Sequence, residues 1–170
     1  LRAAVREVPD FPQPGIAFKD ITPVLLSPAL MAEAARALAA PWAQAGITRV
    51  VGIESRGFLF GPLLAQALGA GFVIVRKAGK LPPATTGIAY SLEYGDAAIE
   101  VSTEALRPAD RVLIHDDLLA TGGTAGAAAA LARRLGAQVA GYSFLIELAF
   151  LAGRARLEAE GARVEAVVGY

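Results

Sequence analysis

Short, nearly continuous apolar runs alternate along this chain with longer segments in which apolar and polar residues are mixed. The short runs predict strands, because they are too brief for helices and rich in Val and Ile. The longer segments are typical of helices that pack one face on a core. Strands are therefore expected at 49–53, 72–75, 111–115, 139–148 and 163–170, and helices at 28–46, 58–69, 123–135 and 154–160.

Capping and breaking residues mark the ends of several elements. Ser27 and Pro28 are typical of a helix start, and this first helix is expected to bend or break at Pro41. Gly136 is expected to stop the third helix. Residues 87–102 predict two strands joined by a hairpin turn near the Tyr-Gly-Asp tripeptide.

Strand–helix alternation, with strands that are apolar on both faces, indicates an α/β fold. We expect a mainly parallel twisted sheet flanked by helices on both faces. A chain of 170 residues is long enough for one domain with a substantial core and too short for two comfortable ones. A single domain is therefore expected over residues 1–170.

Two segments fall outside this alternation. Residues 1–27 are rich in proline and aromatic residues and show no sustained period. Because Phe11, Phe18 and Ile21 need cover from water, the segment predicts an ordered N-terminal arm that lies on the domain as a hood. Residues 80–92 carry two prolines and two threonines, and they are expected to form a mobile lid that excludes water from a site.

Composition excludes several classes of function. Lys plus Arg equal Asp plus Glu at 16 each, so no general attraction to nucleic acid or an anionic membrane is expected. The absence of cysteine excludes disulfides and thiolate catalysis, and the single histidine, His115, excludes a multi-histidine metal site. Residues 57–75 approach the length of a membrane span, but Pro62 and the Gly-Ala-Gly break at 69–71 favour a buried helix followed by a strand. With no signal peptide apparent in residues 1–10, we expect a cytosolic (cytoplasmic) protein.

The segment VLIHDDLLATGGTAGAA places two carboxylates after a predicted strand and a glycine turn before a predicted helix. Ligands of parallel α/β sheets bind beyond the carboxyl ends of the strands, so Asp116 and Asp117 are expected at the ligand-binding edge. The following turn is expected to direct backbone N–H groups, the positive end of the helix dipole and two threonine hydroxyls at one anion, which suits a phosphate monoester. The residues of this turn are Ala120, Thr121, Gly122, Gly123 and Thr124.

The two acids need a different partner, because carboxylates repel a bare phosphate. They are expected to face sugar hydroxyls or a hydrated Mg²⁺, which together with the phosphate turn describes a ribose 5-phosphate site. A plainer alternative remains open, namely a solvated Asp-Asp cap followed by a glycine turn. The turn is not a P-loop, because the G-x4-G-K-[ST] pattern is missing and no lysine follows the glycines.

This segment resembles the phosphoribosyl pyrophosphate motif of the type I phosphoribosyltransferases, with an apolar strand, two acids, small residues and Thr-Gly-Gly-Thr. Three further segments narrow the resemblance to the adenine phosphoribosyltransferases, namely DFPQPGIAFKDITPVL, GIESRGFLFGPLLA and RKAGKLPPATTGIAYSLEYG. The matching segments cover nearly the whole chain in the right order. Two positions depart from the family pattern: His115, where a hydrophobic residue is usual, and Lys19, where arginine is frequent.

The resemblance implies a reaction in which adenine and 5-phosphoribosyl 1-pyrophosphate (PRPP) give AMP and pyrophosphate. N9 of the base attacks C1 of the ribose, so the transition state builds positive charge on the sugar and negative charge on the leaving group. Mg²⁺ is expected to bridge pyrophosphate and ribose hydroxyls without a dedicated all-protein site, with Asp116 and Asp117 as its candidate protein contacts. The family also implies a homodimer, and no nucleic-acid or membrane partner is expected.

The family pattern assigns catalytic roles to two residues. Arg56, in the ESRG turn, is expected to stabilise the leaving group, and Glu93, in SLEYG, is expected to act as acid and base on the purine. Periodicity alone does not distinguish Glu93 from Glu100. The implied pyrophosphate site consists of Ser55, Arg56, Arg76, Lys77 and Lys80.

Arg76 or Lys77 is expected to reach across the dimer interface, although cations of this kind are in general solvated surface residues. For adenine, the resemblance implies stacking on Phe18, an apolar contact with Leu148, and hydrogen bonds from the backbone of Ala17 and Lys19. Plain core positions for Phe18 and Leu148 remain the alternative.

Two other functions remain open. One is the same transfer to a different purine, such as guanine, hypoxanthine or xanthine. The other is a regulatory module that binds a nucleotide without catalysis. Three conspicuous residues receive no chemical role: His115 is expected to be packed or hydrogen-bonded, Trp42 to pack in the core, and Glu147 to be paired at a strand end.

Overall fold

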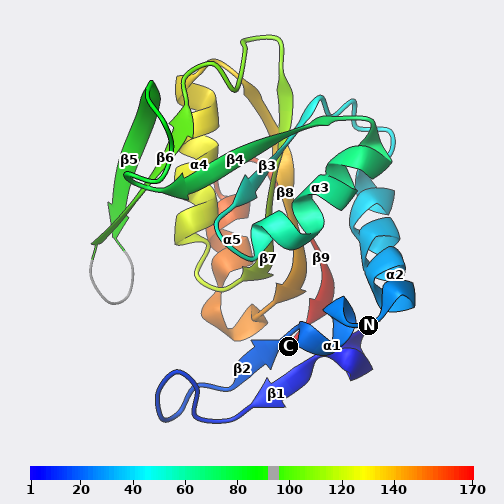
Figure 1. Cartoon of the computed structure of the whole chain (residues 1–170). Helices are drawn as coiled ribbons and strands as arrows, with labels where there is room; N and C mark the ends of the chain where they lie inside the picture. The colour runs from blue at the N-terminus through cyan, green and yellow to red at the C-terminus, as the bar shows by residue number, and fades with distance from the viewer. Residues whose placement is uncertain (92–95) are drawn as a thin grey trace.

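A seven-stranded sheet lies at the centre of the computed structural model, which describes residues 1–91 and 96–170 (Figure 1). Its strands are β3 (Arg49–Ile53), β4 (Gly71–Lys77), β5 (Thr85–Ser91), β6 (Asp96–Ser102), β7 (Arg111–Leu119), β8 (Gln138–Glu147) and β9 (Arg163–Gly169). The strand order is β5-β6-β4-β3-β7-β8-β9. Strands β4, β3, β7, β8 and β9 pair in parallel, and the antiparallel β5–β6 pair forms one edge. The mainly parallel sheet expected from the sequence is confirmed.

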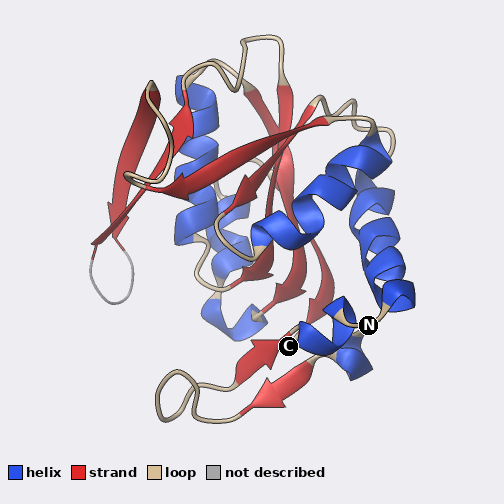
Figure 2. Ribbon diagram, viewed as in Figure 1, coloured by secondary structure: helices blue, strands red, loops and turns tan. Residues whose placement is uncertain are grey.

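Helices cover both faces of this sheet (Figure 2). They are α2 (Pro28–Ala39), α3 (Gly57–Leu68), α4 (Gly123–Arg134) and α5 (Gly153–Glu158). One buried cluster joins α2 and α3 to the sheet, and a second joins α4 and α5 to the opposite face. The predicted start of α2 is confirmed, because the Ser27 hydroxyl accepts a hydrogen bond from the Leu30 amide at 3.4 Å. The helix ends at Ala39, before a single 3-10 turn that contains Pro41.

The Phe72 side chain of β4 packs against both β3 and α3. Its ring lies against two glycines, Gly52 of β3 and Gly61 of α3. A Cβ atom at either glycine would lie 2.4 Å from a ring carbon of Phe72, closer than packed carbon atoms allow. These glycines therefore let β3, β4 and α3 approach one another, which fixes the turn between β3 and α3 at the carboxyl edge of the sheet.

The N-terminal arm forms a small separate sheet at this carboxyl edge. It contains a 3-10 turn (Arg2–Ala4), the antiparallel pair β1 (Arg6–Val8) and β2 (Phe18–Asp20), and α1 (Thr22–Leu25). In Figure 1 the arrowheads of β8 and β9 point toward this arm, and the C-terminus lies beside β2 and α1. Within this arm Ile21 is buried as expected. The expected burial of Phe11 is wrong: its side chain is 51% exposed, because it lies in the loop that extends beyond the β1–β2 pair.

The helix followed by a strand that the sequence favoured for residues 57–75 is confirmed. This segment divides into α3, of 12 residues, and β4. Within residues 1–91 and 96–170, no helix has the length and apolar character that a membrane crossing requires.

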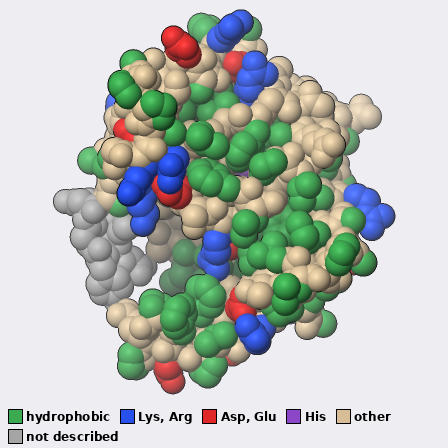
Figure 3. Space-filling model, viewed as in Figure 1, with side chains coloured by type: hydrophobic (Ala, Val, Ile, Leu, Met, Phe, Trp, Pro, Cys, Tyr) green, Lys and Arg blue, Asp and Glu red, His purple; other side chains and the backbone are tan. Residues whose placement is uncertain are grey.

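On the face drawn in Figure 3, basic side chains lie in small separate groups rather than in one continuous basic surface.

Candidate active site

The acid pair lies inside strand β7 rather than after it. The sequence predicted that the strand ends at His115, but β7 continues to Leu119, and Asp116 pairs with Phe144 of β8. The prediction was wrong because two adjacent acids disfavour a strand locally, whereas the ladder with β8 continues through them. The carboxylate of Asp116 accepts a hydrogen bond from the Asp117 amide at 2.9 Å. Both acids still lie near the carboxyl end of the strand, as predicted.

The two carboxylates have different surroundings. The side chain of Asp117 is only 4% exposed, and its Oδ2 lies 2.9 Å from Nε of Arg56. The N–H group does not point at that oxygen, so the contact is a charge pair rather than a directed hydrogen bond. Asp116 instead lines two cavities.

Burial governs the charge state of this pair. Burial raises the pKa of Asp116 well above its usual range, and the neighbouring Asp117 charge raises it further. Burial also raises the pKa of Asp117, but the Arg56 guanidinium opposes that shift. Asp117 is therefore the carboxyl that ionises first, and Asp116 gains its negative charge most easily when a cation enters the adjoining cavity.

The turn that follows β7 encloses a cavity of about 150 Å³ at the N-terminus of α4. All five predicted phosphate-binding residues line it: Ala120, Thr121, Gly122, Gly123 and Thr124. Gly122 has a left-handed backbone with φ of 77°, which glycine adopts without steric cost. The first amides of α4 have no partner within their own helix, so the turn offers N–H donors and the positive helix end together.

Two other glycines allow neighbouring elements to approach this turn. A Cβ atom at Gly57, the first residue of α3, would lie 2.9 Å from the His115 carbonyl oxygen and 3.1 Å from Asp116 Oδ1. A Cβ atom at Gly153, the first residue of α5, would lie 2.1 Å from the Ala120 carbonyl oxygen. Close packing of α3 and α5 therefore fixes both the acid pair and the turn from outside.

The turn between β3 and α3 contributes Ser55, which is exposed, and Arg56, which is partly buried. The Arg56 guanidinium contacts two regions of the site, because it pairs with Asp117 and its central carbon lies 5.0 Å from the ring centre of Phe18 in the arm. Arg56 thus connects the acid pair in β7 to the arm.

The carboxyl end of β4 supplies two further cations with different environments. Arg76 is engaged: its guanidinium donates to Glu54 Oε1 at 2.7 Å and to the Lys80 carbonyl oxygen at 3.0 Å. The hydrogen bond from Arg76 is the main reason that the pKa of Glu54 is lowered. Lys77 is exposed and lines a cavity of about 590 Å³ together with Glu54 and Asp116. Of these two cations, Lys77 is the one with its ammonium available to an anion in that cavity.

Glu100 has a structural role. Its carboxylate accepts hydrogen bonds from the amides of Lys80 and Leu81 at 2.8 and 2.9 Å and from the Thr85 hydroxyl at 3.1 Å. These bonds, with the Leu81 amide first, lower the pKa of Glu100. Glu100 therefore fixes the start of the expected lid, residues 80–92, and the side chain of Lys80 itself is exposed. Glu93 lies outside the described residues.

Strand β5, in the second half of the expected lid, contacts the phosphate turn directly. The Tyr90 hydroxyl donates a hydrogen bond to Thr124 Oγ1 at 3.1 Å. Tyr90 also lines the 590 Å³ cavity with Lys77 and Asp116. The segment that was expected to cover the site is thus in contact with it.

A third cavity, of about 610 Å³, lies between the arm and the chain after β8. Three of the four residues predicted to bind adenine line it: Ala17 and Lys19 from the arm, and Leu148 from the main domain. Phe18 does not line this cavity. Its ring packs edge-on against Phe11, with centres 5.1 Å apart, and beneath Arg56.

The Lys19 side chain is not directed at a ligand. It is buried, its ammonium pairs with Glu7, and the same ammonium lies 4.0 Å from the centre of the Tyr170 ring. Only the backbone of Lys19 is therefore available to a base in the cavity. This geometry is consistent with the expected backbone role and with tolerance of either lysine or arginine at this position.

Comparisons with known proteins agree with this geometry. The profile of the phosphoribosyl transferase domain matches residues 24–164. The adenine phosphoribosyltransferase of Streptomyces clavuligerus is 55% identical over 168 residues, which cover 99% of this chain and 94% of that protein. The chain belongs to the adenine phosphoribosyltransferase family.

Solved structures support the same family assignment. The adenine phosphoribosyltransferase of Rhodothermus marinus has a TM-score of 0.94 at 55% identity, over 100% of this chain and 96% of that one. The enzyme of Giardia lamblia, solved in complex with 9-deazaadenine, has a TM-score of 0.94 at 40% identity, over 99% of this chain and 95% of that one. The predicted fold of a type I phosphoribosyltransferase is therefore confirmed over nearly the whole chain.

The three residues without an assigned role are placed as expected. His115 is fully buried, with Nδ1 3.0 Å from the Ser143 carbonyl oxygen, and burial lowers its pKa to about 4. Trp42 is buried in the core, and Glu147 pairs with Arg154 of α5 at 2.6 Å. His115 thus contributes a neutral, packed imidazole to the core.

Sequence reasoning missed several residues that shape this adenine phosphoribosyltransferase site. Glu54 had a usable signal, since it directly follows a predicted strand and therefore lies at the ligand-binding edge. Tyr90 and Gly153 had no local signal, because their roles depend on elements that meet only in the folded chain.

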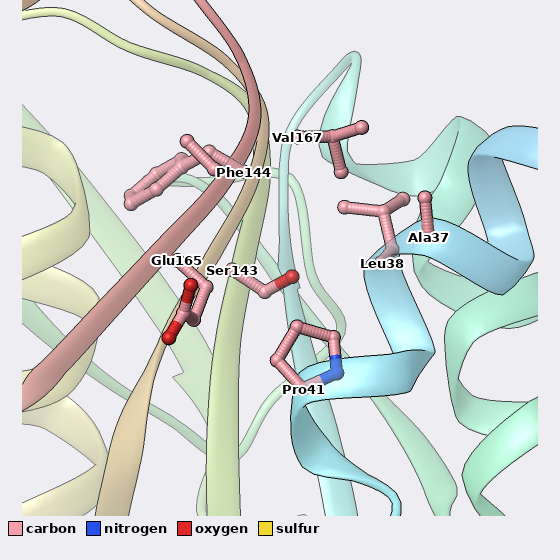
Figure 4. A pocket seen from close by; sticks show the side chains of 8 residues that line it. Ala37, Leu38, Pro41, Ser143, Phe144, Glu165 and Val167 are labelled. Carbon is pink, nitrogen blue, oxygen red and sulfur yellow. The ribbon is translucent and has the colours of Figure 1, made fainter.

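A further cavity, of about 80 Å³ between α2 and strands β8 and β9, has room for only a few water molecules (Figure 4).

Proposed function

We propose that this enzyme transfers the 5-phosphoribosyl group of PRPP to N9 of adenine, forming AMP and releasing pyrophosphate. One observation carries the proposal: Asp116 lines both the phosphate-sized cavity at α4 and the larger cavity beside β4. The 5-phosphate and the pyrophosphate of PRPP need two anion sites separated by a ribose, and Asp116 lies where those two spaces meet. The Giardia lamblia relative, which was solved with an adenine analogue, supports adenine as the base.

In this proposal the 5-phosphate occupies the turn Ala120–Thr124, and the ribose hydroxyls face the acid pair. The turn suits the phosphate because its N–H donors and the α4 dipole are fixed before the ligand arrives. Asp116 suits the sugar because its carboxylate can accept hydroxyl hydrogen bonds at the junction of two cavities. The pairing of Asp117 with Arg56 limits it to a supporting role in orientation.

The pyrophosphate occupies the 590 Å³ cavity beside β4. Lys77 supplies a cation there, and the exposed Ser55 and Lys80 lie on segments that border the same edge. Arg56 contributes when the incoming pyrophosphate competes with Asp117 for its guanidinium. Arg76 acts mainly by holding Glu54 and the backbone of Lys80 in place. This division makes Lys77 and Arg56 the main contributors to leaving-group stabilisation.

The base lies in the 610 Å³ cavity, between the arm and Leu148. Backbone groups of Ala17 and Lys19 bind its edge, and Leu148 packs on its face. Stacking on Phe18 requires its ring to turn away from Arg56, which the binding of Arg56 to pyrophosphate favours. During transfer the bond between C1 and the pyrophosphate oxygen breaks, the C1–N9 bond forms, and the proton that the purine loses passes to a base on its N7 side. Glu93 is proposed as that base.

Magnesium fits the donor set of this site. Asp116 offers a carboxylate beside both anion spaces, and Mg²⁺ prefers carboxylate, water and phosphate oxygens to a dedicated protein site. When bound with PRPP, the ion neutralises charge on the departing pyrophosphate.

A homodimer and a mobile lid remain part of the proposal, as does a cytoplasmic location. Exposed apolar side chains on α3 and β4, Leu59 at 41% and Ile74 at 42%, support an interface on that side of the sheet. Light scattering at micromolar concentration gives twice the monomer mass if the dimer is correct.

The direct test mixes the purified chain with adenine, PRPP and Mg²⁺ and measures AMP by chromatography. AMP formation, with little product from guanine, hypoxanthine or xanthine, is the expected result. Preferred turnover of a 6-oxopurine would overturn the choice of base. Nucleotide binding without release of pyrophosphate would replace the enzyme with a non-catalytic sensor.

The role of Glu93 is tested with Glu93→Gln and, as a matched control, Glu104→Gln at an exposed turn. Loss of an acid/base group is expected to lower kcat by roughly a hundredfold to ten-thousandfold. The KM for PRPP is expected to stay near the original value, and the control is expected to behave as the unmodified protein. Full turnover by Glu93→Gln across pH would remove Glu93 from the mechanism.

A further inference from the structure

Tyr170 connects the end of β9 to the N-terminal arm through its side chain. The Lys19 ammonium lies 4.0 Å and the Arg2 guanidinium 4.7 Å from the centre of its ring. The Tyr170 hydroxyl donates a hydrogen bond to the Arg2 carbonyl oxygen at 3.2 Å. Arg2 in turn donates from its guanidinium to the Gly169 carbonyl oxygen at 2.7 Å. Two cations of the arm therefore converge on one aromatic ring of the main domain.

The backbone of Tyr170 binds a different segment. Its amide donates to the Glu147 carbonyl oxygen at 2.9 Å, and its carbonyl oxygen accepts from the Ala149 amide at 2.9 Å. Glu147 and Ala149 flank Leu148. The two hydrogen bonds thus fix the chain on both sides of Leu148 at the point where it leaves β8.

Lys19 and Leu148 line the same cavity of about 610 Å³, the one assigned to the base. Lys19 belongs to the arm, and Leu148 belongs to the main domain. Tyr170 does not line the cavity. It nevertheless contacts the wall at Lys19 with its ring and the wall at Leu148 with its backbone. Figure 1 shows the C-terminus of the chain beside the arm, in agreement with these contacts.

We propose that Tyr170 is a positioning residue that sets the width of the base cavity by joining its two walls. This inference rests on the proposed function, because it gives the width of the cavity a role in binding adenine. A flat purine needs contact on both faces, so an arm that moves away from Leu148 weakens base binding. The phosphate turn and the acid pair belong to other elements and do not depend on these contacts.

The test compares three substitutions at this position. Tyr170→Ala removes the ring, and the KM for adenine is expected to rise roughly tenfold, as expected for loss of a partly desolvated cation–π contact together with its packing. Tyr170→Leu keeps apolar bulk without a π face and is expected to show most of that rise. Tyr170→Phe keeps the ring and loses only the hydroxyl, so it is expected to restore a KM close to that of the original protein.

The KM for PRPP and kcat at saturating adenine are expected to change less than twofold in all three variants, because the cavities that hold PRPP are intact. The matched control is Arg163→Ala. It removes another cation–π contact, between Arg163 and Trp42 at 4.9 Å, at the amino end of β9. A loss of stability alone would lower the unfolding free energy of Tyr170→Ala and Arg163→Ala alike. It would leave the KM for adenine and the KM for PRPP unchanged in both variants.

A second measurement is independent of activity. Hydrogen exchange of the β2 amides, residues 18–20, is expected to speed up at least tenfold in ligand-free Tyr170→Ala, with β7 unchanged. Unchanged exchange in β2, or an unchanged KM for adenine in a chain that forms AMP, would overturn the role of Tyr170 and leave the proposed function intact. Failure of the original chain to form AMP would overturn the proposed function, while the exchange experiment would still decide whether Tyr170 holds the arm.

Discussion

The proposed phosphate side of the site is formed by residues 116–124, which follow one another in the chain, whereas the proposed base cavity is lined by residues of the arm and by residues after β8, which lie far apart in the chain. On the phosphate side, one strand, one turn and one helix start supply every predicted contact. On the base side, β2 of the arm must be held against the chain after β8. That requires contacts such as the one between Tyr170 and Arg2, 168 residues apart.

The geometry of the first region thus depends mainly on local sequence, and the geometry of the second depends on tertiary packing. The N-terminus of a helix offers unpaired N–H groups and a positive dipole whatever surrounds it. A glycine turn before a helix therefore needs few contacts with distant segments to form an anion site. The base cavity has no such local element. Its geometry depends on ion pairs and aromatic contacts between the arm and the main domain, and these contacts are individually weak. Substitutions on the two sides should therefore affect different substrates.

Among substitutions that distinguish the two sides by their KM values, the largest effect is expected at Gly122. Gly122→Ala places a Cβ at a φ of 77°, 3.1 Å from the Gly153 carbonyl oxygen and 3.2 Å from Leu157 Cγ. The KM for PRPP is expected to rise about thirtyfold, which corresponds to ~2 kcal/mol, with little change in the KM for adenine. Gly46→Ala is the matched control, since Gly46 also has a left-handed φ, of 62°, but has no atom within 4 Å of the added carbon.

Both glycine variants are expected to unfold more easily by about 1–2 kcal/mol from the left-handed backbone alone, as measured by denaturant titration. Only Gly122→Ala is expected to lose affinity for PRPP. An equal KM for PRPP in the two variants would show that the turn is not the phosphate site.

The next effect is expected at Asp117. Asp117→Asn removes the charge that holds Arg56 beside the ribose space, and the KM for PRPP is expected to rise about tenfold. Asp110→Asn is the matched control: this buried carboxylate pairs with Thr48 at 2.8 Å and Arg49 at 3.7 Å, at the amino edge of the sheet. It should lower stability without changing either KM. Normal affinity for PRPP in Asp117→Asn would remove that residue from the ribose site.

A smaller effect is expected on the base side. Phe18→Leu removes the ring that Arg56 and Phe11 contact, and the KM for adenine is expected to rise about fivefold, as for the loss of one aromatic contact. Phe11→Leu, at the exposed neighbour, is expected to change the KM for adenine less than twofold. If steady-state kinetics show that Phe18→Leu affects PRPP instead, the two sides are not independent.

The smallest effect is a pH dependence of the arm. Hydrogen bonds from Thr22, with help from Arg6, lower the pKa of Asp20 from its ordinary value of 3.8 to about 2. Because the folded-state pKa is depressed, the stability that Asp20 contributes is present above about pH 4 and is lost as the pH falls through about 2. Exchange of the β1 and β2 amides should speed up over that interval, and Asp20→Asn should abolish the change. A flat profile in the original chain would contradict this role of Asp20.

The same contrast explains how much the sequence could predict. The sequence could predict that Ala120–Thr124 form one turn at the start of a helix, because strand, glycine turn and helix are adjacent in the chain. The sheet followed from apolar runs such as residues 49–53, which β3 matches. The extension of β7 through Asp116 was not predictable, since it depends on pairing with β8.

The base side was predicted only through family resemblance. Lys19 and Leu148 carry no local signal that they share a cavity, and Tyr170 carries none that it joins them. Phe18 was expected to offer a free face, but the structure places Arg56 on it. Contacts between segments far apart in the chain determine all of these features, and the pattern of apolar and polar residues gives no information about such contacts.

The most direct test of the account is a crystal structure of the protein with AMP. We predict that the phosphate accepts hydrogen bonds from the amides of the Ala120–Thr124 turn, and that the purine lies between the arm and Leu148. A phosphate bound elsewhere, with the turn at α4 free of ligand, would contradict the assignment of this turn and the division of the site that depends on it.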